Sequence, residues 1–267
     1  MEQSFAFRGH RIHTGTVGNG PAIVVAHGTP WSSDTMRPLI DLLARDYRVH
    51  FYDMLGYGRS AKPEDDVSLG VQNELLNALI DHWHLDAPIA IGHDFGGATV
   101  VRAHLLNHRA FAAMILIDPV ILTPWGSPFF VHVREHREAF EGLPGRLHRA
   151  LLAEYVQTAA YRRLDSASID AIVEPWMGDE GQPAFYRQIA QADETYTAEI
   201  VPRLTSVGAR TLILWGEQDS WIPVERGYRL AHAIPGVVIR SVSEAGHLVV
   251  QEKPQELARA IREFCGR

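Results

Sequence analysis

Cysteine is nearly absent from this sequence: the single cysteine among 267 residues is Cys265. One cysteine cannot form an internal disulfide. Cys265 falls at the end of an expected terminal helix and has no metal-ligand spacing around it, so we expect an inert thiol there.

Long apolar runs and clusters of basic residues are also missing. No apolar stretch approaches the roughly 20 residues that cross a bilayer. Residues 1–8 lack the basic segment and apolar run of a secretory signal. The formal net charge is −7 without any Lys/Arg cluster, which argues against nucleic-acid or membrane partners. These absences together predict a cytoplasmic protein.

The composition that remains is that of an ordinary globular enzyme. Hydrophobic residues make up 46% of the chain and charged residues 21%. The length suits one large α/β domain, with or without an insertion.

Apolar, β-branched runs alternate with runs of helical spacing in the first and last parts of the chain. This alternation is typical of an α/β fold, a mostly parallel sheet with helices on both faces. The expected strands are residues 4–8, 11–16, 22–26, 47–52, 89–91, 113–117, 211–215 and 237–242, and the expected helices are 36–43, 71–83, 98–106, 223–233 and 254–264.

The alternation breaks between residues 122 and 203, where no strong strand pattern occurs. Helical stretches at 129–140, 147–160, 168–173 and 185–192 are separated by prolines and are rich in aromatic residues. We interpret residues 122–203 as a helical cap, or lid, inserted after the sixth strand, and residues 1–121 with 204–267 as the core domain.

A very tight turn follows the expected strand at residues 89–91. Gly92, Gly96 and Gly97 lack a Cβ, so the strand and the next helix can approach closely. Asp94 lies at the apex of this turn, at a helix N-terminus that favours negative charge. The turn has the pattern of a nucleophile elbow, G-x-S-x-G, with aspartate in the place of serine.

This elbow resembles that of the α/β-hydrolase family, in its branch with an aspartate nucleophile, the epoxide hydrolases and dehalogenases. Asp219 and His247 follow two later strands, and the order Asp94, Asp219, His247 is the nucleophile–acid–histidine order of that family. The resemblance extends from His27 to His247 and implies a catalytic triad of these three residues.

Asp118, which follows the strand at 113–117, is an alternative acid, because some dehalogenases place the acid there. We favour Asp219, whose loop holds the acid in the usual chain order. Asp118 can also be read as part of a lid hinge that Pro119 makes rigid.

The segment from His27 to Pro30 resembles the H-G-x-P oxyanion loop of the family. The resemblance implies an oxyanion hole made by the backbone N–H groups of Thr29 and Phe95. His27 alone could equally be a turn residue that closes a strand.

An aspartate nucleophile suits attack on an sp³ carbon, because the product is a stable alkyl ester. His247, oriented by Asp219, would then activate water against that ester. Epoxides and alkyl halides fit this scheme. No His/Asp cluster has ligand spacing, so the sequence indicates no metal or other cofactor.

The residues around the elbow bear on the leaving group. Haloalkane dehalogenases hold halide with an Asn or a lid Trp and a Trp after the nucleophile, whereas Thr29 and Phe95 stand at the loop and elbow positions here. The Arg pair of fluoroacetate dehalogenases is replaced by Phe95 and Ala98. Epoxide hydrolases use lid tyrosines as proton donors, and the segment around Tyr186 resembles one of their two tyrosine segments.

The other expected tyrosine has no clean match, and Tyr155 and Tyr161 are the candidates, although Tyr155 could instead pack its helix. We expect Tyr186, Tyr155, Trp31 and Trp125 to bind a small apolar organic substrate. Epoxide hydrolysis is our leading hypothesis. A haloalkane or haloacid dehalogenase, an esterase or lactonase, and a non-catalytic ligand-binding protein are the alternatives, and the oligomeric state stays open.

Overall fold

The computed structural model describes residues 2–266, and its strands form one 8-stranded sheet in the order β1-β2-β4-β3-β5-β6-β7-β8. The pairs β1–β2 and β2–β4 are antiparallel and every other pair is parallel. The sheet is therefore mostly parallel, as predicted. The strands are β1 (Glu2–Phe7), β2 (His10–Val17), β3 (Ala22–Ala26), β4 (Arg48–Tyr52), β5 (Ile89–His93), β6 (Ala113–Ile117), β7 (Thr211–Gly216) and β8 (Val238–Val242).

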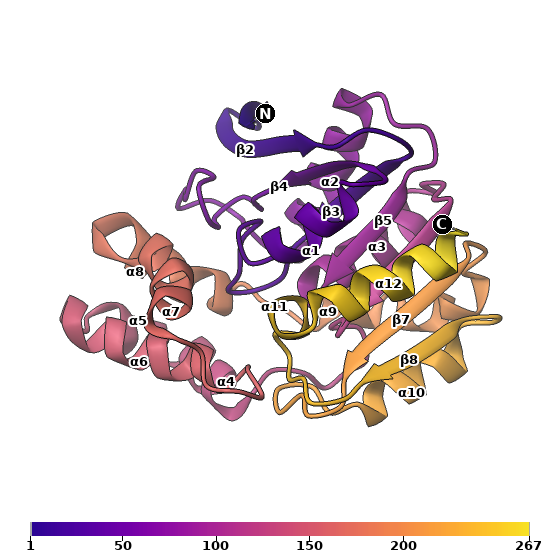
Figure 1. Cartoon of the computed structure of the whole chain (residues 1–267). Helices are drawn as coiled ribbons and strands as arrows, with labels where there is room; N and C mark the ends of the chain where they lie inside the picture. Colours follow the sequence, from indigo (N-terminus) through magenta and orange to yellow (C-terminus); the bar gives the residue numbers. More distant parts are fainter. Residues whose placement is uncertain (1, 267) are drawn as a thin grey trace.

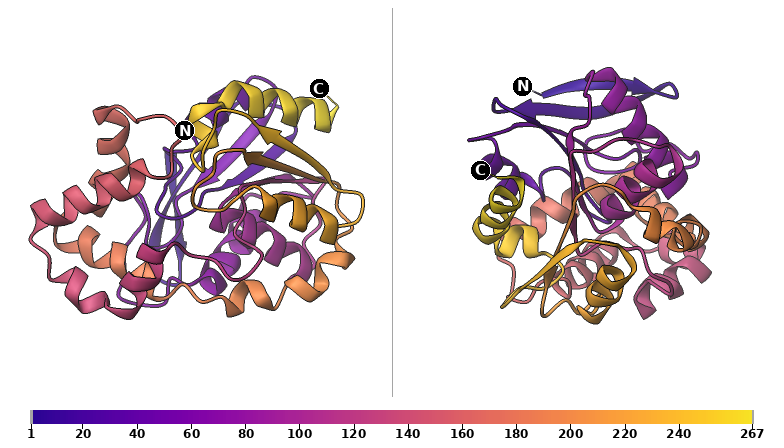
Figure 2. Two further views of the ribbon diagram at one scale, coloured as in Figure 1. Left: turned by 90° about the horizontal axis from the view of Figure 1, so that it is seen from below. Right: turned by 90° about the vertical axis from the view of Figure 1, so that its right-hand side faces the viewer.

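Helices cover both faces of this sheet (Figure 1, Figure 2). Alternate residues of β3 belong to different cores: Val24 packs in one hydrophobic cluster and Val25 in the other. A strand buried on both faces reads as a continuous apolar run, which explains the pattern in the sequence. The helices of these layers are α1 (Arg37–Leu43), α2 (Leu69–His82), α3 (Phe95–Leu106), α10 (Glu225–Ala233), α11 (Val249–Glu252) and α12 (Pro254–Cys265).

Between β6 and β7 the described chain contains helices and no strand. The elements of this insertion are α4 (Pro128–Glu135), α5 (Arg137–Glu141), α6 (Gly145–Gln157), α7 (Ser166–Val173), η1 (Glu174–Trp176), α8 (Gly178–Ala190), α9 (Thr195–Ala198) and η2 (Val201–Ser206). Helices α4 to α8 of this insertion lie beside the sheet, at the left of Figure 1, whereas α9 lies near the centre of that view.

Two expectations for the insertion were wrong in detail. The single helix expected at 129–140 is split at His136, whose φ of −130° and ψ of 34° are not helical, although neither Pro nor Gly signals the break. Conversely, α8 begins at Gly178 and runs through Pro183, whereas we expected a helix only from residue 185, with Pro183 among the prolines that separate the helical stretches. Internal proline costs a helix about 3 kcal/mol. Here Ala184, Phe185 and Tyr186 bury their side chains just beyond it and offset that cost.

None of the helices within residues 2–266 combines the length and the apolar character needed to cross a membrane.

Candidate active site

The tight turn between β5 and α3 holds Asp94 in a strained backbone conformation, with φ of 54° and ψ of −117°. A Cβ on Gly92 would lie 2.3 Å from the carbonyl oxygen of Gly96, and a Cβ on Gly96 would lie 2.1 Å from that of Ala26. The helix can follow the strand this closely only because both residues are glycine. The same close approach projects the Asp94 side chain from the end of the strand.

His247 connects two carboxylates. Its Nδ1 lies 2.8 Å from Oδ2 of Asp219, and its Nε2 lies 3.4 Å from Oδ2 of Asp94. All three side chains are buried. The remaining oxygen of Asp219 accepts hydrogen bonds from the backbone N–H groups of Trp221 and Ile222, both at 2.8 Å. Asp219 is thus fixed by its own loop while it holds the ring of His247.

The pKa of His247 lies well above its usual value. Burial alone would lower it, but the charge of Asp219, its hydrogen bond to Nδ1 and the nearby Asp94 together outweigh burial. The contacts with the two carboxyl groups thus favour the protonated form of the His247 ring.

Asp118, the alternative acid, makes a different contact. Its Oδ1 accepts a hydrogen bond of 2.9 Å from the backbone N–H of Gly216, and its Oδ2 has no partner within residues 2–266. Burial and then the charge of Asp219 raise its pKa well above the usual value. It is Asp219, not Asp118, that is hydrogen-bonded to His247, as we favoured from the sequence.

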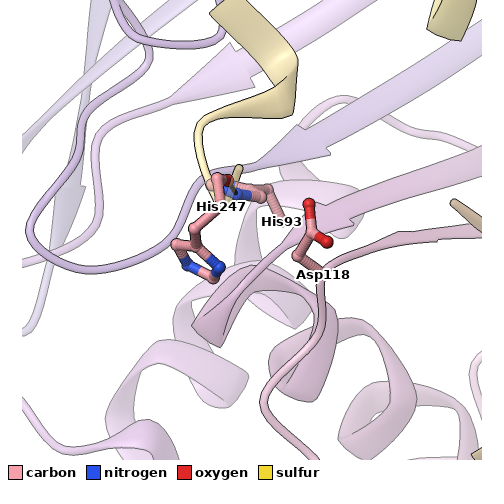
Figure 3. A group of neighbouring side chains, drawn as sticks. All are labelled: His93, Asp118 and His247. Carbon is pink, nitrogen blue, oxygen red and sulfur yellow. Dashed lines mark hydrogen bonds between the residues drawn. The ribbon is translucent and has the colours of Figure 1, made fainter. Parts of the chain in front are cut away.

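His93 supports the loop that carries His247, and sequence reasoning missed it. Its Nε2 donates to the backbone carbonyl of His247 at 2.8 Å. Burial, and next the neighbouring His247, lower the pKa of His93 to about 3, so the ring is neutral. Figure 3 shows His93 and Asp118 beside His247, each at the end of its own strand. The G-H-D order at the elbow was the available signal.

The loop after β3 brings a backbone donor to the elbow. The N–H of Thr29 donates to Oδ1 of Asp94 at 2.7 Å. A Cβ on Gly28 would lie 2.3 Å from the same oxygen, so the loop can come this close only with glycine there. Phe95 is the first residue of α3, and the part expected of its N–H in the oxyanion hole stays a prediction.

His27 holds this loop in place. Its Nδ1 donates to the carbonyl of Gly28 at 2.8 Å, and its Nε2 accepts from the N–H of Met54 at 2.9 Å. Burial lowers its pKa, in agreement with a neutral ring. Gln188 of α8 connects the insertion to this loop. Its Oε1 accepts hydrogen bonds from the hydroxyl of Thr29 at 2.8 Å and from that of Tyr57 at 2.9 Å.

A small cavity opens in front of Asp94. About 40 Å³ of it is open to the centre of a water-sized sphere, and most of its wall is apolar. Two of the expected substrate-binding residues, Tyr155 and Trp125, line it. The lining residues are Thr29, Asp94, Phe95, Val120, Trp125, Gly126, Ser127, Phe130, Tyr155, Trp221 and Ile222.

Trp31 and Tyr186, the other two expected substrate-binding residues, do not line this cavity. Trp31 stacks on Trp221, with ring centroids 5.5 Å apart. The hydroxyl of Tyr186 lies 2.7 Å from Nδ1 of His148, whose Nε2 donates to a backbone carbonyl, so Tyr186 donates to His148. The packing of α8 turns the side chain of Tyr186 toward α6, and its expected part in substrate binding stays a prediction.

Trp221 is the most prominent residue that sequence reasoning missed. Its ring stacks on Tyr155 at 4.6 Å and lies 5.2 Å from the ring of His247. Its position two residues after Asp219 was the signal that could have identified it.

Two groups of side chains within residues 2–266 bring possible metal ligands together, although the sequence spacing suggested none. One comprises His93, Asp118 and His247 in the core. The other comprises His132, Glu135 and His136, all exposed at the C-terminal end of α4 and outside the lining of the cavity. The first group includes the histidine that Asp219 already orients, and we derive no metal-dependent step from either group.

Comparison with known proteins settles the family. The profile of the Alpha/beta hydrolase family matches residues 23–260. The chain belongs to this family. An α/β-hydrolase fold protein from Burkholderia ambifaria has a crystal structure with a TM-score of 0.96 and 44% identity, over 98% of this chain and 97% of that one.

Relatives of this α/β-hydrolase are named for different reactions. Haloalkane dehalogenase 2 of Mycobacterium tuberculosis is 26% identical, over 96% of this chain and 92% of its own length. An epoxide hydrolase of Caballeronia sordidicola is 31% identical, over 50% of this chain and 42% of its own length. Family membership therefore indicates a hydrolase, and the reaction has to be argued from the site.

Proposed function

We propose that this α/β-hydrolase opens epoxides with Asp94 as the nucleophile, through an alkyl ester that His247-activated water hydrolyses. The two oxygens of Asp94 support this division of labour. Oδ1 is bound by the N–H of Thr29, and Oδ2 points toward His247 beside the cavity. One oxygen is thus held by a donor and the other is available to attack.

In the first step, Oδ2 of Asp94 attacks an epoxide carbon and the C–O bond of the ring breaks. The ring oxygen takes a proton from the hydroxyl of Tyr155, which lines the cavity. Burial, and next the charge of Asp94, raise the pKa of Tyr155, so the hydroxyl keeps its proton until an oxyanion forms nearby. The product is a hydroxyalkyl ester of Asp94.

In the second step, His247 takes a proton from water, which attacks Cγ of the ester. Esterification removes the charge of Asp94, one of the causes that raise the pKa of His247. His247 therefore becomes a base when one is needed. The oxyanion develops on Oδ1, which Thr29 already binds. Before water attacks, His247 gives its proton to the phenolate of Tyr155, which becomes a phenol again. Collapse of the tetrahedral intermediate breaks the bond between Cγ and the alkyl oxygen. That oxygen leaves with the hydroxyl proton of the intermediate as the diol, so Asp94 is a carboxylate again and His247 keeps the proton it took from water.

Tyr155 is the single observation that favours an epoxide over a halide. Its hydroxyl is a proton donor in the cavity, as an opening epoxide requires. Two indole N–H groups of the cavity wall are engaged elsewhere: that of Trp125 donates to Thr197 at 2.8 Å and that of Trp221 to Thr158 at 2.9 Å. Halide release would need such donors free.

We also propose that residues 122–203 act as a lid over the core formed by 1–121 and 204–267. Tyr155 and Gln188 of the insertion reach the site, which supports this division. The small cavity is consistent with a lid that must move before substrate binds.

The test is the intact mass of His247→Gln after incubation with terminal epoxides and, separately, with alkyl bromides. Without its base the enzyme should stall at the ester, so we expect a mass gain equal to the whole epoxide. Asp94→Asn/His247→Gln is the matched control and should gain nothing. If wild type turns over no epoxide and the stalled variant forms no epoxide adduct, the proposal fails.

Dehalogenation is the second candidate. It is supported by the 26% identical haloalkane dehalogenase, which is matched over 96% of this chain. A mass gain equal to the alkyl group alone, with bromide released, would favour it.

A further inference from the structure

A second, larger hollow adjoins the catalytic cavity on the outside of the insertion. About 530 Å³ of it is open to the centre of a water-sized sphere, compared with about 40 Å³ in the catalytic cavity. Helices α4, α5 and α6 and the loop after β7 supply its walls. We call it the outer groove; its lining residues are Ser127, Pro128, Phe129, Phe140, Leu151, Glu154, Tyr155, Thr158, Ser220 and Trp221.

Three residues line both the outer groove and the catalytic cavity: Ser127, Tyr155 and Trp221. The side chains of Ser127 and Tyr155 share a hydrogen bond, and Trp221 stacks on Tyr155 at 4.6 Å. Because these three residues belong to the walls of both spaces, the outer groove lies directly beside the catalytic cavity.

The catalytic cavity and the outer groove differ in volume, so they can hold different parts of one substrate. One water needs about 10–15 Å³ measured in this way, so the catalytic cavity has room for only a few atoms beyond the reacting carbon. The outer groove is large and mostly apolar. Its one charged lining residue is Glu154, and no Lys or Arg lines it, so an anionic group would find no partner there.

We propose that the outer groove is a binding subsite for the uncharged, apolar tail of a terminal epoxide. This inference rests on the proposed function for the chemistry at Asp94. The reacting end lies in the catalytic cavity, and the tail passes between Ser127, Tyr155 and Trp221 to lie against Phe129, Phe140 and Leu151. The preferred substrates therefore have medium-length alkyl or aryl substituents.

The test compares 1,2-epoxyoctane with 1,2-epoxybutane. Each buried methylene is worth about fourfold in affinity, so we expect kcat/KM to be at least tenfold higher for the longer substrate. Leu151→Glu places a charge in the outer groove and should remove that preference. Leu147→Glu is the matched control, because Leu147 lies on the same helix, is 49% exposed and does not line the groove.

A binding measurement separates failure of the subsite from failure of the chemistry. Octan-1-ol, which cannot react, should change the tryptophan fluorescence of wild type through Trp221, and butan-1-ol should do so far more weakly. Leu151→Glu should lose the octanol response and Leu147→Glu should keep it. Octanol binding without epoxide turnover would uphold the subsite and reject the proposed function. No octanol binding, or equal turnover of both epoxides, would overturn the subsite.

Discussion

Asp118 and Asp219 are buried near the same histidine, and their surroundings differ. Asp219 accepts two backbone hydrogen bonds and its other oxygen contacts His247. Asp118 accepts one backbone hydrogen bond, and burial and then the charge of Asp219 raise its pKa. The contact with His247 therefore distinguishes Asp219 from Asp118.

This difference predicts that replacing Asp219 by Asn and replacing Asp118 by Asn affect turnover differently. Asp219→Asn should lower turnover by about 10²–10⁴-fold, because it removes the charge that orients and stabilises protonated His247. Asp118→Asn keeps an oxygen that can accept from the N–H of Gly216 and leaves the contact between Asp219 and His247 in place, so turnover should stay near wild type. Steady-state kinetics of both variants on one epoxide would check this. A greater loss in Asp118→Asn would assign the acid to Asp118.

The raised pKa of His247 makes stability depend on pH in a defined direction. The folded protein binds this proton more tightly than the unfolded chain, whose histidine titrates near 6.5. The resulting stabilisation is complete below that pH and is lost as the pH rises through the higher native pKa. Urea unfolding of wild type and His247→Gln at increasing pH above 6.5 should show the free energy of unfolding of wild type falling relative to that of the variant. A constant difference would contradict the shift.

At the level of elements, the loop after β3 can pack closely against Asp94 of the elbow because Gly28 has no Cβ. Gly28→Ala should force the Asp94 carboxylate to move, because the new Cβ would lie 2.3 Å from Oδ1. A displacement of about 1 Å can cost 10²-fold in rate, and we expect a loss of that order in adduct formation. Gly208→Ala is the matched control, since a Cβ there meets nothing within 4 Å. Equal rates in both variants would disprove the steric argument.

The elements differed in how far the sequence could specify them. The sheet and the elbow were predicted because a doubly buried strand and a glycine turn are encoded locally, in residues 89–97. The helices of the insertion were harder, because their ends and faces depend on tertiary packing. Tyr186 illustrates this: its segment matched a family pattern, but the packing of α8 placed Gln188 at the site instead. Ser127 gave too little local signal to be assigned to the cavity.

For the whole molecule, the insertion is tied to the core through a few buried polar contacts. Gln188 accepts from Thr29 and Tyr57, and the indole N–H of Trp176 donates to the carbonyl of Pro30 at 2.8 Å. Because these contacts end on the oxyanion loop, the position of the insertion and the geometry of the site are coupled.

Gln188→Leu should therefore affect both stability and rate. It leaves the hydroxyls of Thr29 and Tyr57 without their acceptor, at a cost of about 1–3 kcal/mol in unfolding free energy. Urea unfolding would measure that cost. Turnover should fall as well, because Thr29 loses its support from the insertion. Gln188→Glu keeps an acceptor and should recover part of both losses; a variant with wild-type stability and rate would show that the contacts are not coupled.

The raised pKa of Asp118 offers an internal spectroscopic reporter. A protonated carboxyl has a carbonyl stretching vibration apart from the bands of carboxylates, so infrared spectra over a pH titration should contain a band that persists to higher pH than those of other carboxyl groups and that Asp118→Asn lacks. The charge of Asp94 is one of the causes that raise the pKa of Asp118. In the proposed mechanism esterification removes that charge and adds an ester carbonyl, so the Asp118 band should shift as the ester band appears, without any attached label.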